Sequence, residues 1–297
     1  MDIDRQRIGM IGIGMMGLGI ATNLLKHGHA LCVMEHPGNQ PLDALKAAGA
    51  VGAGSAAEVA AQADIVITVL TGAPEVENVL LGTGGVLERL RPGSVVVDCS
   101  TSLPSTTAKV AAAVAAAGSG FLDAPMTRTP KEAAEGRLNL LVGGDADVLE
   151  RCRAVLACFA ENILHAGPVG AGHSMKLLHN FVSLGSVALV CEAAACASTL
   201  GIRPEVFVDI LAKGGGRGVA LERVAPYLLQ RETAQLRFTT ANAAKDAGYY
   251  RTMAAQCGAE AAIADAVVDC LQRAAGLAPA ALLPELADLL VHRQASA

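Results

Sequence analysis

The segment Gly12-Ile13-Gly14-Met15-Met16-Gly17 constrains the fold of this chain more than any other feature. It directly follows the apolar run 8–11 and directly precedes the helix-like stretch 18–27. In such a strand, turn and helix, the three glycines allow the turn, the approach of phosphates to the backbone, and close packing of the helix. The free N–H groups and the positive helix end then face an anion. We therefore predict a Rossmann unit that holds a dinucleotide pyrophosphate through Gly12, Gly14, Met15, Met16 and Gly17.

An acidic residue, Glu35, closes the next apolar run, residues 30–34. It follows Gly17 at close to the spacing of about 20 residues expected of a ribose-binding carboxylate. A carboxylate at this place accepts hydrogen bonds from the ribose hydroxyls of NAD and repels the additional phosphate of NADP. We expect NAD as the cofactor, with NADP as the alternative.

Short apolar runs alternate with helical patterns through the first half of the chain, which is typical of a doubly wound α/β fold with a parallel sheet. The strand candidates are residues 8–11, 31–34, 65–70, 94–97, 121–123 and 138–142. Such sheets bind ligands at the carboxyl ends of their strands. We therefore expect Leu70, residues 98–101 and residues 123–125 to lie at the binding edge.

The second half of the chain has a different character. After a helix near 148–159 and a short strand near 163–165, the pattern from Ala171 onwards is helical. The length of 297 residues exceeds one typical domain of about 100–200 residues. We predict a Rossmann domain over 1–168 and an all-α domain over 169–297, joined by a long helix near 172–200.

Composition excludes several classes of partner. The formal net charge is −5, aromatic residues make up 3% and tryptophan is absent. Such a chain has no general attraction to nucleic acid or to anionic membranes, and no aromatic platform for bases. The eight cysteines are scattered singly, which favours reduced, buried thiols over a metal site. We expect no metal, no nucleic acid and no membrane as a partner.

Two segments bear on localisation. The charged residues 1–7 do not have the pattern of a signal or transit peptide, so we expect a cytoplasmic protein. The stretch 181–202 is long and apolar enough to suggest a membrane span. Glu192 near its middle and several serines favour a buried helix of a globular domain instead.

Four polar residues form one stripe on the expected long helix: Lys176, His179, Asn180 and Ser183. The other faces are nearly all apolar, so the stripe needs a polar partner, such as a cleft between two domains. A lysine in a cleft can stabilise and protonate the oxygen of a carbonyl that receives hydride, and it can accept the proton in reverse. Lys245 on a later helix is a candidate neighbour, with a surface lysine paired to Asp246 as the alternative.

Through these motifs the chain resembles the β-hydroxyacid dehydrogenases, the group that contains 3-hydroxyisobutyrate dehydrogenase and tartronate semialdehyde reductase. The resemblance spans nearly the whole chain and rests on residues 12–23, 123–125, 170–180 and 244–246. It implies a Rossmann domain followed by an all-α domain that forms the interface of a homodimer or homotetramer. It also implies Lys176 as the catalytic residue, Thr101 near the nicotinamide ribose and Lys245 near the cofactor.

The substrate loop departs from the usual pattern of that family. It reads Met126-Thr127-Arg128-Thr129-Pro130 where Ser-Gly-Gly is usual, and His179 replaces the first of two adjacent asparagines. The Arg-Thr pair resembles sulfolactaldehyde reductase-type members, in which the arginine helps to hold a sulfonate and a serine matching Ser183 lies nearby. The planar fork of Arg128 suits a carboxylate, sulfonate or phosphate, although a surface loop arginine is the alternative. We expect the substrate to be bound by Thr127, Arg128, Thr129, His179, Asn180 and Ser183.

The sequence therefore predicts an NAD-dependent oxidoreductase that interconverts a small anionic hydroxyacid and its semialdehyde, as 3-hydroxyisobutyrate dehydrogenase does. Within the family, a sulfolactaldehyde or succinic semialdehyde type of reductase is the alternative. A dinucleotide-binding protein without turnover and an imine reductase are the alternatives from other classes. The presence of Lys176, Asn180 and Lys245 weighs against the first of these, and Lys176 also weighs against the second.

Overall fold

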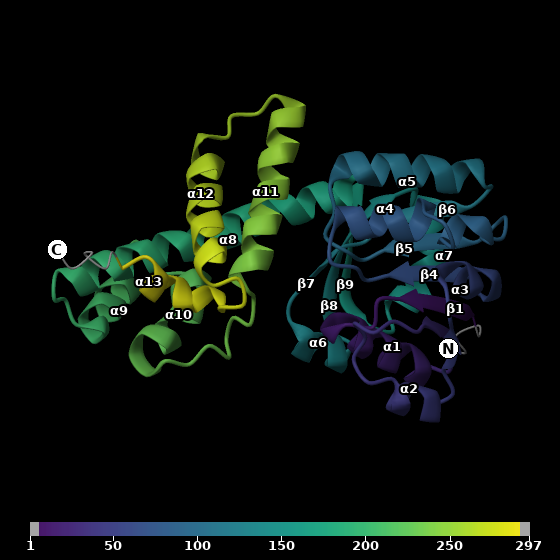
Figure 1. The fold of residues 1–297 in the computed structure, drawn as a ribbon, viewed down its shortest axis with the longest axis horizontal. Helices are drawn as coiled ribbons and strands as arrows, with labels where there is room; N and C mark the ends of the chain where they lie inside the picture. Colours follow the sequence, from purple (N-terminus) through teal and green to yellow (C-terminus); the bar gives the residue numbers. More distant parts are fainter. Residues whose placement is uncertain (1–5, 292–297) are drawn as a thin grey trace. The chain divides into compact units, whose positions relative to one another are not determined.

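The computed structural model describes residues 6–291, drawn as a ribbon in Figure 1. The chain divides into two compact units, residues 1–176 and 177–297, and each is described by itself. Residues 1–5, on which part of our expectation about targeting signals depends, lie outside the described range.

One mixed sheet forms the centre of the first unit. Its strands follow the order β3-β2-β1-β4-β5-β6-β8-β7, and β9 pairs with β8. The strands are β1 (Arg7–Ile11), β2 (Ala30–Met34), β3 (Val51–Ala53), β4 (Ile65–Thr68), β5 (Val95–Asp98), β6 (Gly120–Asp123), β7 (Met126–Thr127), β8 (Leu138–Gly144) and β9 (Ala160–Gly167). From β3 to β6 every pairing is parallel, whereas β8 runs antiparallel to β6 and β7.

Both faces of this sheet are covered by helices, which explains why the central strands are apolar throughout. The helices are α1 (Met15–Lys26), α2 (Asp43–Ala47), α3 (Ala56–Gln62), α4 (Ala73–Leu81), α5 (Pro104–Ala116), α6 (Pro130–Glu135) and α7 (Ala146–Leu156), with a 3-10 turn η1 (Val86–Glu88). One core contains Leu24 of α1 and Leu149 of α7. The core on the other face contains Val59 of α3, Val76 of α4 and Val110 of α5.

The α/β Rossmann architecture predicted from the sequence is confirmed, and all six strand candidates are present. Two short strands were missed. β3 has a glycine at its centre, and β7 has only two residues, so neither gives a usable period. The antiparallel pairings of β8 were also not anticipated, because an apolar run does not reveal strand direction.

The strand order reverses between β1 and β4. In open α/β sheets, ligands bind beside the carboxyl ends of the strands at such a switch point. The glycine motif directly follows β1, and Leu70 lies two residues beyond the end of β4. The topology therefore places both at the expected cofactor edge.

Helices make up the second unit, in agreement with the predicted all-α region. They are the part of α8 (Ala171–Thr199) beyond Lys176, then α9 (Pro204–Lys213), α10 (Val219–Gln230), α11 (Thr240–Cys257), α12 (Ala262–Leu277) and α13 (Leu286–Leu289), with a 3-10 turn η2 (Leu283–Glu285). Their core contains Leu184 and Cys191 of α8, Ala247 of α11 and Val268 of α12. Among described residues, α8 alone is long and apolar enough to cross a membrane. Its packing into this core fits the expected buried helix of a globular domain.

Candidate functional site

The glycine loop after β1 depends on the absence of side chains at two positions. Gly12 has a φ of +96°, and a Cβ added there would lie 2.1 Å from the carbonyl oxygen of Val69. A Cβ added at Gly17 would lie 2.1 Å from the carbonyl oxygen of Gly12. Both glycines are therefore required by the turn and by the close packing of α1 against it.

Gly14 plays a different part in the same loop. It is the N-cap residue of α1 and has no side chain to cap the helix, and a Cβ added there would meet no atom within 4 Å. The first N–H groups of a helix have no intrahelical acceptors and carry its positive end. Met15 is 63% exposed beside this open space, while Met16 packs against the core. The room and the donors fit a dinucleotide pyrophosphate.

Glu35 follows the end of β2, where its N–H donates to Ala53 O (2.9 Å). Its carboxylate pairs with Lys46 Nζ at 2.8 Å, and the two side chains are about half exposed. A Cβ at Gly52 would lie 1.9 Å from Glu35 Oε1, so this glycine makes room for the carboxylate. His36 Nδ1 accepts a hydrogen bond from the Gly38 N–H (3.0 Å).

Asn39 links the glycine loop to β2 and was not identified from the sequence. Its Oδ1 accepts from the Ile13 N–H (3.2 Å), and its Nδ2 donates to Met34 O (2.8 Å). An asparagine in a turn gives no sequence signal for partners 26 residues away. Asn39 therefore ties the glycine loop to the end of β2, next to Glu35.

Asp98 organises the segments that follow β4 and β5. Its Oδ1 accepts from Thr68 Oγ1 (2.8 Å) and from the Ser100 N–H (3.0 Å). Ser100 Oγ in turn accepts from the Leu70 N–H (2.9 Å). Thr101, half-buried, is the next residue. The two predicted cofactor residues Leu70 and Thr101 thus lie on segments joined by one buried hydrogen-bond network.

A second buried carboxylate, Asp123 at the end of β6, holds the first turn of α8. Its Oδ1 accepts from the Gly170 N–H and its Oδ2 from the His173 N–H, both at 2.8 Å. Burial raises the pKa of Asp123, while the charge of His173 and these hydrogen bonds act in the opposite direction. A carboxylate at a helix N-terminus is also favoured by the helix dipole.

The His173 side chain is fully buried and completes this network. Its Nδ1 lies 2.7 Å from Thr107 Oγ1, and its Nε2 lies 3.1 Å from Ser100 O. The same ring is 3.8 Å from one oxygen each of Asp98 and Asp123. Sequence reasoning missed His173, although its place one turn before Lys176 offered a signal.

Lys176 lies on α8 three residues after His173 and is half-buried. Its Nζ donates to Met126 O at 2.7 Å. The anchored helix start therefore presents this ammonium to the segment 126–129, which contains the predicted substrate-binding residues Thr127, Arg128 and Thr129.

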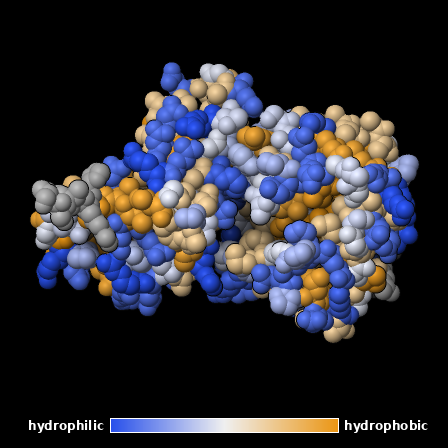
Figure 2. All heavy atoms as spheres, viewed as in Figure 1, coloured by the Kyte–Doolittle hydropathy of each residue, from blue (hydrophilic) through white to orange (hydrophobic). Residues whose placement is uncertain are grey.

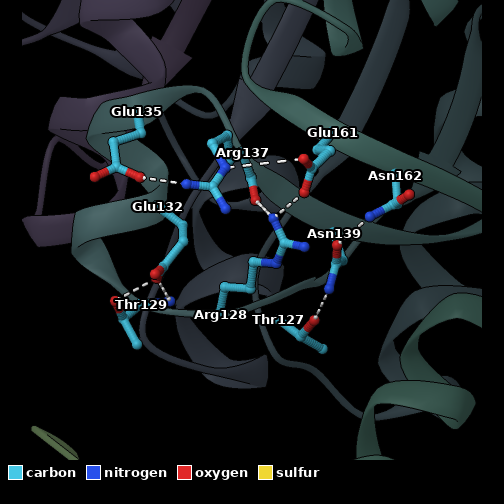
Figure 3. Close-up of polar contacts among 9 residues, drawn as sticks. All are labelled: Thr127, Arg128, Thr129, Glu132, Glu135, Arg137, Asn139, Glu161 and Asn162. Atoms are coloured by element: carbon cyan, nitrogen blue, oxygen red, sulfur yellow. Dashed lines mark hydrogen bonds and ion pairs between the residues drawn. The ribbon is translucent and has the colours of Figure 1, made fainter. Parts of the chain in front are cut away.

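Figure 3 shows that Arg128 is held by its neighbours. Its Nη1 donates to Arg137 O and to Glu161 Oε2, and its side chain is 27% exposed. The backbone of Arg128 has a φ of +82°, a conformation that costs free energy in a residue with a side chain. Glu161 was not identified from the sequence because it lies on β9, 33 residues away.

The two threonines beside Arg128 have structural partners. Thr127 Oγ1 accepts from Asn139 Nδ2 (3.1 Å). Thr129 caps α6, where its hydroxyl accepts from the Lys131 N–H. It also donates to Glu132, as Figure 3 shows. The hydroxyls of both threonines thus have partners within the chain, and their assignment to the substrate stays a prediction.

The remaining predicted residues lie in the second unit. Asn180 is buried; its Nδ2 donates to Asp246 Oδ2 (2.8 Å), and its Oδ1 lies 3.1 Å from Nδ1 of the exposed His179. Lys245 Nζ is 2.8 Å from Asp246 Oδ1 and 5.1 Å from the centre of the Tyr249 ring. Ser183 is half-buried on α8. Asp246 therefore joins two predicted site residues, Asn180 and Lys245.

Within residues 6–291 no three His, Cys, Asp or Glu side chains are grouped as a metal site. Six of the eight cysteines are buried, as expected, whereas Cys196 and Cys257 are exposed. Burial raises the pKa of the Cys152 thiol to about 11, which keeps it protonated at neutral pH.

Two family models match the chain. Residues 7–167 match the NAD binding domain of 6-phosphogluconate dehydrogenase, and residues 170–281 match the NAD-binding model of NADP-dependent 3-hydroxyisobutyrate dehydrogenase.

Individual relatives cover most of the chain. The chain is 37% identical to NAD-dependent L-serine dehydrogenase of Pseudomonas aeruginosa over 222 residues, which are 75% of this chain and 74% of that protein. It is 36% identical to 3-sulfolactaldehyde reductase of Escherichia coli over 212 residues, which are 71% of each. Mycobacterium tuberculosis 3-hydroxyisobutyrate dehydrogenase, solved with L-serine, superimposes with a TM-score of 0.86 at 28% identity, covering 97% of this chain and 100% of that one.

The glycine loop yields a matched pair of substitutions. Gly17→Ala forces a methyl group against a backbone carbonyl and should lower the free energy of unfolding by about 1–3 kcal/mol. Gly14→Ala meets open space and should change it by less than about 1 kcal/mol. The added methyl group of Gly14→Ala would occupy the room that we expect the pyrophosphate to fill, so the NADH dissociation constant should rise at least about tenfold. Urea unfolding and NADH fluorescence titration measure these quantities; unchanged NADH affinity in Gly14→Ala would place the cofactor elsewhere.

Two helix-capping aspartates provide a second matched pair. Both carboxylate oxygens of Asp123 accept hydrogen bonds, from the Gly170 and His173 N–H groups. In Asp123→Asn one of these oxygens becomes an NH₂ group, a donor that faces one of these N–H donors. Asp145 caps α7 through Oδ1 alone, so Asn can replace it. We expect the free energy of unfolding to fall by about 1–3 kcal/mol in Asp123→Asn and by less than about 0.5 kcal/mol in Asp145→Asn. Equal losses in urea unfolding would contradict the two-oxygen anchor.

Proposed function

Because the chain belongs to the β-hydroxyacid dehydrogenase family, we propose that it interconverts a small anionic hydroxyacid and its semialdehyde, with Lys176 moving the proton. Membership makes the protein an NAD(P)-dependent oxidoreductase of hydroxyl-bearing substrates. The observation that carries the proposal is the anchoring of α8 by Asp123, which presents Lys176 to the segment 126–129. A 3-hydroxyisobutyrate type of substrate is our first choice.

The chain's own groups have distinct tasks in this reaction. The bound nicotinamide supplies the hydride chemistry. Lys176 donates a proton to the oxygen of the carbonyl as that oxygen gains negative charge, and in the oxidative direction it accepts the alcohol proton. The exposed start of α1 binds the pyrophosphate through Gly14, Met15 and Met16, while Gly12 and Gly17 keep the loop tight. Leu70, Thr101 and Lys245 are assigned to the rest of the cofactor.

We assign substrate binding to Thr127, Arg128, Thr129, His179, Asn180 and Ser183. Arg128 offers the charge for the anionic end of the substrate, since its planar guanidinium matches a carboxylate or sulfonate with two parallel hydrogen bonds. The names L-serine dehydrogenase and 3-sulfolactaldehyde reductase denote relatives whose substrates carry a carboxylate and a sulfonate respectively. A sulfolactaldehyde or succinic semialdehyde type of reductase is therefore the alternative within the family.

The proposed preference is for NAD over NADP. The Glu35 carboxylate lies at the end of β2, where it would accept the ribose hydroxyls and repel an added phosphate. This carboxylate supports NAD, with NADP as the alternative.

We further propose that the protein is a homodimer or homotetramer. Several large apolar side chains of α8 and α9 are exposed in the second unit: Leu178, Val182, Leu189 and Ile210. Apolar patches of this unit also reach the surface in the view of Figure 2. Exposed patches of this kind mark interaction surfaces.

Two further predictions concern domain organisation and localisation. The domains are predicted to be residues 1–168 and 169–297, and the two matched family models support this boundary because one ends at residue 167 and the other begins at residue 170. The predicted location is the cytoplasm.

Lys176→Ala tests the central assignment. Loss of a general acid and base should lower the turnover number by about 10²–10⁴-fold, while the NADH dissociation constant changes little. The assay follows NADH absorbance with 3-hydroxyisobutyrate, L-serine, 3-sulfolactaldehyde and succinic semialdehyde. Lys109→Ala removes an exposed lysine paired with Glu77 and should leave turnover unchanged. Turnover of Lys176→Ala at the normal rate would reject the role, and no turnover of any such substrate by the unaltered protein would reject the proposed function.

Glu35→Ala tests the cofactor preference. Removal of the carboxylate ends its repulsion of the phosphate and leaves Lys46 without this partner, so the NAD/NADP ratio of kcat/KM should fall by roughly tenfold. Lys46→Ala, which keeps the carboxylate, should not lower that ratio. A ratio that stays constant in Glu35→Ala would show that the carboxylate does not face the ribose.

A further inference from the structure

Arg128 is the predicted anion-binding residue, and it already has an anion as a partner. Its guanidinium donates to the carboxylate of Glu161 and to the carbonyl of Arg137, as Figure 3 shows. The residue has a left-handed backbone at φ +82°. Non-glycine residues with this geometry cluster at functional sites, where surrounding contacts hold them.

Glu161 is an ionised group shared by two arginines. Its Oε2 accepts from Arg128, and its Oε1 lies 3.8 Å from Arg137 Nε. The hydrogen bond from Arg128 and then its charge lower the pKa of Glu161. Arg137 in turn pairs with Glu135 through its Nη1 at 2.9 Å. Glu161 therefore keeps a cation beside it even when Arg128 changes partner.

The exposure of this pair makes such an exchange inexpensive. The side chain of Arg128 is 27% exposed and that of Glu161 is 46% exposed. Ion pairs in contact with water contribute little to stability, whereas a substrate oxyanion that binds both arms of the guanidinium forms two parallel, charge-assisted hydrogen bonds. A suitable anion can thus displace Glu161.

We propose that Glu161 is a specificity-determining residue that occupies Arg128 in the absence of substrate and competes with the anionic group of the substrate. This inference rests on the proposed function, because it gives Arg128 to the substrate. Glu161 weakens the binding of every anion at Arg128 by the same factor, so only groups that bind the guanidinium strongly, such as the carboxylates and sulfonates that engage both of its arms, displace it. A neutral substrate gains nothing from displacing it.

Glu161→Gln tests the inference, with Glu135→Gln as the matched control. Both remove one carboxylate from the same charge network, but Glu135 pairs with Arg137 and not with Arg128. In Glu161→Gln the KM for the anionic substrates should fall about two- to fivefold, with the effect in KM and not in kcat. Glu135→Gln should leave both constants unchanged. Thermal unfolding of both variants checks that the fold is intact.

A second measurement does not depend on turnover. Calorimetric titration of the NAD-loaded protein with sulfate should give a dissociation constant about two- to fivefold lower in Glu161→Gln than in the unaltered protein. The gain should vanish when Arg128→Gln is added, since the two residues act through one contact. A gain that persists without Arg128, or an unchanged sulfate affinity in Glu161→Gln, would overturn the inference. If no hydroxyacid is turned over while sulfate behaves as expected, the proposed function fails and the competition between Glu161 and anions stands.

Discussion

The two oxygens of the Asp123 carboxylate, each bonded to one N–H at the start of α8, are the contact on which the candidate site depends. The contact joins the carboxyl end of β6 to the helix that carries Lys176. It is fully buried, so no water competes for either oxygen. Without it the first turn of α8 would have unsatisfied donors, and Lys176 would have no fixed position beside Met126.

Glycines permit this contact, which gives a physical reason for their spacing. A Cβ at Gly143 would lie 2.6 Å from Asp123 Oδ1, and one at Gly172 would lie 2.3 Å from the carbonyl oxygen of Leu141. The helix therefore approaches β8 and Asp123 only because both positions lack side chains. His173 then fills the remaining space between Asp98 and Asp123, and both nitrogens of its ring have oxygen partners.

Sequence reasoning succeeded where the signal was local and failed where partners were distant. The glycine loop, each apolar strand and the long helix are each contained in fewer than about 30 consecutive residues, so local sequence patterns identify them. Asp123 and His173 are 50 positions apart, and nothing in either local pattern reveals the other. The same holds for Arg128 and Glu161. Arg128 could be predicted as a charge in the substrate loop, but the carboxylate that it contacts could not.

The polar groups at this edge of the sheet fall into two kinds, separated by burial. Asp98, Asp123 and His173 are inaccessible to solvent, and a change of partner would leave a buried charge or donor unsatisfied. They suit a permanent task, which is to fix α8 and the segments that follow β4 and β5. The pairs Arg128–Glu161 and Glu35–Lys46 are partly exposed, and water can replace either partner at low cost. Both lie where we expect a ligand, and in these pairs a ligand can take the place of one partner without breaking a buried contact.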